Sequence, residues 1–201
     1  MSKAYFLAGA LALAPALAAA QRGGPPADPD WPCIQRLVPT LSGGAYWPGH
    51  DAPAEWRSDP RAAALVAEVT ARNVTAERGA ERIAAFAQGV PPNERASVLT
   101  AVMAGLVEET NAQRGAVIDR LRALTRRQRG VGEVIARVTA EQRALPPDAD
   151  PARREEVAQR LAFVIREFEE AERTLRYACE APVALEGRLG TYARALQRAL
   201  E

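Results

Sequence analysis

The sequence predicts an all-α protein: a helical bundle built on a long antiparallel coiled-coil-like hairpin, with an irregular strap before it. Three observations support this fold class. From residue 59 onward, apolar residues recur at helical spacing, and no segment shows the alternation of a strand. Two long apolar seams, at 93–145 and 151–180, are separated by a short proline-rich loop. Residues 21–58 are rich in Trp, Pro and Gly and fit neither period.

Residues 1–20 predict a cleavable secretory signal peptide. Lys3 supplies the positive start, an apolar run begins at Tyr5, and Ala18-Ala19-Ala20 forms an A-x-A cleavage site. The apolar run is shorter than the roughly 20 residues that span a bilayer, and an uncleaved anchor is the alternative. No later run is long and apolar enough to cross a membrane. We therefore expect an exported, periplasmic protein with no transmembrane segment after cleavage.

The charge balance argues against a nucleic-acid partner. Lys3 is the only lysine, so residues 21–201 carry 25 arginines against 25 acids. A chain without net charge creates no field that gathers an anionic polymer or membrane surface. The excess of Ala, Arg and Pro over Lys and Asn is typical of a GC-rich genome, which favours a bacterial periplasm over a eukaryotic secretory route.

Local signals place the helices of the domain predicted at 59–201. Asp59 followed by Pro60 is a helix N-cap with proline at the first helical position, and Thr75 is the expected N-cap of the next helix. Pro182 ends or kinks the second hairpin arm before a final helix. The seam of that arm alternates between steps of four and three. Its members are Val157, Leu161, Val164, Phe168, Ala171, Leu175 and Ala178.

Five arginines and no acid lie between Arg120 and Arg129, a run that alone would indicate contact with an anion or a nucleic acid. The predicted hairpin provides compensating charges on the second arm. Three arginines, Arg126, Arg127 and Arg129, are expected opposite Glu170, Glu169 and Glu167. We therefore interpret the run as a salt-bridged helix face.

Cys33 and Cys179 are the only cysteines, and an even count in an exported chain predicts a disulfide. Closing a loop of this length is worth about 5 kcal/mol on the chain-entropy model. The alternatives are a redox pair or a metal site. Redox cysteines usually form a C-x-x-C, which this chain lacks, and two cysteines with one histidine are a poor zinc set.

The sequence offers no set of catalytic residues, so we expect a non-enzymatic protein without a cofactor. His50 is the sole histidine, and the motifs of serine hydrolases, zinc proteases and covalent haem sites do not occur. His50 and Glu108 are weak candidates for a metal ligand. Glu108 lies near polar seam residues, which can line a site in a bundle but more often specify register.

One short motif resembles a known family. Leu124-Thr125-Arg126-Arg127-Gln128 is loosely similar to the L-T-x-x-Q pattern of small all-helical periplasmic stress chaperones and metal-resistance sensors. Residues 138–142 form a looser second copy. The resemblance implies metal or small-molecule sensing in the periplasm. It covers less than a tenth of the chain, and those families do not carry a comparable Trp-rich segment, so we assign no family.

The strap holds all three tryptophans and the only histidine. Trp31, Tyr46, Trp47 and Trp56 have two interpretations: side chains that cover helical grooves, or hot spots that bind a partner. The function we expect is that of an accessory, scaffold or chaperone-like protein that binds another periplasmic or envelope protein, with a homo-oligomer possible. The alternative is a periplasmic metal or small-molecule binding or sensing protein.

Overall fold

The computed structural model describes residues 28–48 and 55–201, which form an all-α structure. The predicted signal peptide and His50 lie outside the described residues. No strand occurs in the described parts of the chain, so the predicted all-α class is confirmed. The elements follow in the order η1 (Gly43–Ala45), η2 (Trp56–Ser58), α1 (Pro60–Thr70), α2 (Ala76–Gln88), α3 (Pro92–Ala144), α4 (Pro151–Ala178) and α5 (Glu180–Arg198).

Side-chain caps fix where three of the helices begin. Asp59 caps α1, Thr75 caps α2 and Asp150 caps α4, each by accepting hydrogen bonds from backbone amides of the first turn. Pro60 occupies the first position of α1, where a missing amide donor has no consequence. The caps at Asp59 and Thr75 are the two that the sequence predicts.

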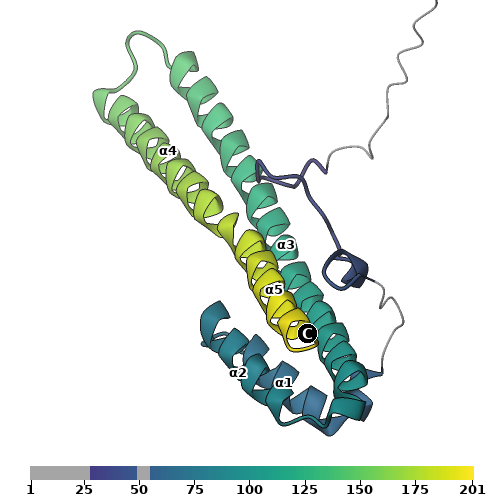
Figure 1. The fold of residues 1–201 in the computed structure, drawn as a ribbon. Helices are drawn as coiled ribbons and strands as arrows, with labels where there is room; N and C mark the ends of the chain where they lie inside the picture. The colour runs from purple at the N-terminus through teal and green to yellow at the C-terminus, as the bar shows by residue number, and fades with distance from the viewer. Residues whose placement is uncertain (1–27, 49–54) are drawn as a thin grey trace, which may run out of the picture.

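The 53-residue helix α3 is the longest element, and α1, α4 and α5 pack against it, whereas α2 packs against α1 and α5 (Figure 1). A loop at residues 145–150 reverses the chain into α4, which runs back beside α3. After a break at Cys179, α5 continues in nearly the same direction. Pro182 in the first turn of α5 has no amide hydrogen for the preceding turn, which accounts for a break there.

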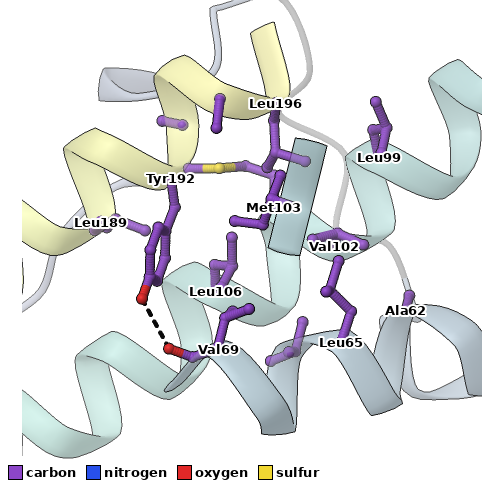
Figure 2. Close-up of a cluster of buried hydrophobic side chains, with 14 of the residues drawn as sticks. Ala62, Leu65, Val69, Leu99, Val102, Met103, Leu106, Leu189, Tyr192 and Leu196 are labelled. Carbon is purple, nitrogen blue, oxygen red and sulfur yellow. Dashed lines mark hydrogen bonds between the residues drawn. The ribbon is translucent and has the colours of Figure 1, made fainter. Parts of the chain in front are cut away.

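The hydrophobic core lies where α1 and α2 pack against α3 and α5 (Figures 1 and 2). Tyr192 crosses it, and its hydroxyl donates a 2.8 Å hydrogen bond to the carbonyl of Val69. The ring passes directly over Gly79, where a side chain would clash with it. Other members include Trp47 of the strap, Leu65 of α1, Ile83 of α2, Leu99, Met103 and Leu106 of α3, and Leu189 and Leu196 of α5.

The outer half of the α3–α4 pair is packed more thinly. Beyond Leu121, Val138 is the one buried side chain among the residues of α3, and α4 buries Val157 and Leu175. The intervening seam positions are half-buried, because two helices without a third cannot enclose their shared seam. This part of the molecule therefore contributes less to stability than the core does.

The arginine run of α3 has different partners from those predicted. Arg126 and Arg129 bind the carboxylate of Asp30 at 2.8 and 2.5 Å, and do not pair with the glutamates at 167–170 in the described structure. These hydrogen bonds hold the pKa of Asp30 below its usual value. The predicted pairing is therefore wrong for these two arginines, because the strap lies on this face and brings its own carboxylates to it.

Candidate functional site

The described parts of the strap, residues 28–48 and 55–58, lie along α3 and run overall in the direction opposite to that helix (Figure 1). Asp28 binds Arg122 of α3 at 2.8 Å, close to the pairs that Asp30 makes. Further along, both backbone groups of Leu41 bind the side-chain amide of Asn111, at 2.8 and 3.0 Å. From Asp30 through Val38 and Leu41 to Trp56, the contacts fall on successively earlier residues of α3: Arg129, Arg114, Asn111 and Glu108. Polar contacts with α3 therefore hold the described part of the strap in one register.

A disulfide between Cys33 and Cys179 joins the strap to the break between α4 and α5, with a Cα–Cα distance of 5.6 Å. The predicted bridge is thereby confirmed. The side-chain amide of Gln35 donates a 2.7 Å hydrogen bond to the carbonyl of Cys179. Both cysteines are only half-buried. The covalent link between the strap and the helices is therefore partly exposed to solvent.

The four aromatic residues of the strap have mostly internal positions. Trp47 is 3% exposed and Trp56 is 7% exposed, both within the core, and Tyr46 is partly buried against it. The indole nitrogen of Trp31 donates to the carbonyl of Gln35, within the strap itself. This placement fits the interpretation that these rings cover helical grooves. That they bind a partner stays a prediction.

Glu108 is engaged by the strap. Its carboxylate accepts a 2.8 Å hydrogen bond from the indole of Trp56 and a 2.6 Å bond from Arg57, whose guanidinium lies 4.0 Å from the centre of the Trp56 ring. These hydrogen bonds lower the pKa of Glu108, and the bond from Trp56 has the larger effect. In the described residues no three His, Cys, Asp or Glu side chains are grouped to hold a metal ion. His50, the other weak candidate, lies outside these residues.

Arg114 is a buried charge that the seam pattern does not single out. It is 2% exposed, and its Nη2 donates to the carbonyl of Val38 at 3.0 Å and to Glu186 of α5 at 2.5 Å. Its Nε and Nη1 find no hydrogen-bond partner among the described residues. The guanidinium therefore links strap, α3 and α5, and Glu186 is its single charged partner within salt-bridge distance in the described structure.

A cleft of about 620 Å³ opens beside the disulfide, and apolar atoms form most of its wall. The strap contributes Pro32 and Ile34, α4 contributes Leu175, and α5 contributes Val183 and Ala184. Ile34 is fully exposed and Val183 is about half exposed, so the cleft presents large apolar side chains to solvent.

A second hollow of about 350 Å³ adjoins the cleft, because Arg176 and Glu180 line both. Its other lining residues are Arg173 and Tyr177, and the tyrosine is 76% exposed. Arg173 pairs with Glu170 of the same helix at 2.8 Å. The two hollows together therefore combine an apolar wall with a polar end that carries both signs of charge.

The sequence does not reveal the cleft, because Val183 shares an apolar stripe with Leu189 in the last helix, and that pattern predicts a side chain that faces inward. The break before Pro182 leaves Val183 exposed instead. One signal was present. Ile34 directly follows Cys33, and Val183 lies one turn after Cys179, so the predicted disulfide already brings two apolar residues together.

Gln128, the last residue of the L-T-x-x-Q stretch, lies in the wall of the cleft. Thr125 of the same stretch donates a hydrogen bond from its hydroxyl to the carbonyl of Leu121, one turn earlier.

Comparison of the chain with family models, with curated proteins and with solved structures finds no match in any of the three. Among the helices that the structure describes, none has the length and apolar character needed to span a bilayer.

Proposed function

We propose that this chain is an exported, non-enzymatic interaction protein of the bacterial periplasm, an accessory, scaffold or chaperone-like partner of another envelope protein. The observation that carries the proposal is the exposed apolar surface around the cleft, formed by Ile34, Tyr177 and Val183. Apolar side chains gathered in solvent mark a place where a partner binds. A second copy of the chain is one form that this partner can take.

Two features support the export part of the proposal. Residues 1–20 have the pattern of a signal peptide. The Cys33–Cys179 disulfide is of a kind that persists in oxidising compartments such as the periplasm and is rare in the cytosol. Residues 21–201 carry no net charge, which favours a protein partner over nucleic acid.

The cleft also supports a second function, the binding or sensing of a small molecule. Its volume of about 620 Å³ falls within the range of about 300–1,000 Å³ that is common for such sites. Its wall is mainly apolar with a few polar groups, as is usual for ligand pockets. A metal ion has less support, because Glu108 is already bonded to Trp56 and Arg57.

Filling the cleft tests both functions. Ala184 is exposed and lines the cleft, so Ala184→Trp should fill it without disturbing the core. Ala140 is also exposed but lies in the outer half of α3, and Ala140→Trp is the matched control. Tagged chains are purified from the native envelope after circular dichroism has shown that all remain helical.

We expect a defined protein to co-purify with the wild type and Ala140→Trp and to be lost from Ala184→Trp. A small molecule that native mass spectrometry finds on the wild type but not on Ala184→Trp would instead support the second function. Equal retention of every bound species by Ala184→Trp and the wild type would refute the role of the cleft.

A further inference from the structure

This inference rests on the second function proposed above, the binding of a small molecule. The apolar cleft and the polar hollow beside it then limit the chemical class of that molecule. The apolar part offers a wall formed by Pro32, Ile34, Leu175, Val183 and the disulfide. Such a wall suits an alkyl chain, which needs no hydrogen-bond partner. Each methylene that is fully buried there strengthens binding about fourfold.

The adjoining hollow supplies the polar end, and its charges are mixed. Arg173 and Arg176 can turn from their present partners to a ligand, because each partner is an exposed glutamate of α4 itself, and exposed ion pairs of this kind are weak. Arginine is well suited to bind phosphate through two hydrogen bonds. Glu180 and the ring of Tyr177 offer the matching site for an ammonium group.

We propose that the cleft binds a lipid with a single acyl chain and a zwitterionic phosphate–ammonium head group. The chain lies along the apolar wall beside the disulfide, and the phosphate binds Arg173 and Arg176. The ammonium group lies against Glu180 and Tyr177. A purely anionic head group would provide no cation to pair with Glu180. A neutral sugar head group would provide no anion to pair with the two arginines.

The test is a calorimetric titration of the oxidised protein with lysophosphatidylethanolamine below its critical micelle concentration. We expect saturable binding that strengthens with acyl length and weakens at least tenfold in Ala184→Trp but not in Ala140→Trp. Arg176→Gln should weaken binding several-fold, whereas Arg166→Gln, at an exposed position of α4 that does not line the cleft, should have no effect.

A second measurement does not depend on the heat of binding. Because both cysteines line the cleft, a bound chain should slow the reduction of Cys33–Cys179 by a water-soluble phosphine. Ala184→Trp should lose this protection by the lipid.

Three results would overturn the inference. They are no saturable binding below the micelle concentration, equal binding of lysophosphatidylethanolamine by Ala184→Trp, or equal affinity for an alkyl sulfate or an alkyl maltoside of the same chain length. If no lipid binds while a protein partner is still lost from Ala184→Trp, the lipid inference fails and the interaction function stands. If no lipid binds and no partner is lost, both fail.

Discussion

Replacing Gly105 by alanine should destabilise the protein, because Trp56 packs directly on this glycine of α3. An added Cβ would lie 2.8 Å from Trp56 Cδ2 and 2.8 Å from Val66 Cγ2. Neither neighbour can move away easily, since Val66 is completely buried and the indole of Trp56 is bonded to Glu108. Overpacking of this kind costs about 1–3 kcal/mol.

Gly115→Ala in the same helix is the matched control, because a Cβ at this position meets nothing within 4 Å. Both substitutions gain the same helix propensity, up to about 1 kcal/mol, so this gain cancels in the comparison. The unfolding free energy of Gly105→Ala should therefore lie about 1–3 kcal/mol below that of Gly115→Ala. Gly115→Ala itself should be as stable as the wild type or slightly more stable.

Urea denaturation followed by tryptophan fluorescence measures both unfolding free energies, and an unchanged denaturant slope would show that the unfolding transition is the same. In thermal melts the difference corresponds to about 2–4 °C for each kcal/mol in a chain of this size. Equal stability of the two variants would refute the packing of Trp56 on α3. Trp56 would then again be a candidate for binding a partner.

Three further predictions concern the disulfide, the first cap and the buried charge. Cys179→Ser should lower the unfolding free energy by about 2–5 kcal/mol, and denatured, unreduced wild type should show no free thiol; two free thiols would exclude the Cys33–Cys179 bridge. The hydrogen bond from Arg61, with those from two backbone amides, lowers the pKa of Asp59 from 3.8 to about 2. The stability that Asp59 adds is therefore complete above pH 3.8 and is lost as the pH falls towards 2. Asp59→Ala should lower the unfolding free energy by about 1 kcal/mol at pH 7. In acid denaturation, the unfolding free energy of this variant should depend less on pH between 3.8 and 2. Glu186→Ala should destabilise more than Arg114→Met, since the first leaves a buried guanidinium without its carboxylate and the second leaves a carboxylate that is 37% exposed to water; the reverse order in urea titrations would contradict this.

Much of the fold could be predicted because its signals are local. Asp59 and Thr75 cap the helices they precede, and the predicted seam of α4, from Val157 to Leu175, is its buried or half-buried stripe. The disulfide was predictable because only two cysteines exist. A helix period and a cysteine count require no knowledge of distant segments.

The pairing of surfaces could not be predicted in the same way. The arginines of α3 could meet the glutamates of α4 or the aspartates of the strap, and the sequence does not say which segment reaches that face. Asp30 reaches that face because the strap lies against α3 and is held by the disulfide at Cys33, three residues later. The burial of Arg114 could not be predicted either, because its carboxylate partner, Glu186, lies 72 residues away in the sequence.

The candidate site illustrates the same limit. The tryptophans made the strap a candidate binding surface, yet Trp47 and Trp56 lie inside the core. The exposed apolar residues at the cleft and the adjoining hollow are instead Ile34, Val183 and Tyr177, each ordinary in its own segment. Ile34 lies near the other two because the disulfide brings the strap to the α4–α5 break.

The most direct test of this account is site-specific photo-crosslinking in the native envelope, with a photoreactive residue at Ile34, at Tyr177 or at the control position Ala140. The central claim is that the chain binds a partner through the surface beside its disulfide. It predicts that Ile34 and Tyr177 give an adduct with one defined protein and that Ala140 does not. Adducts of equal yield from all three positions, or no adduct from Ile34 and Tyr177, would contradict it.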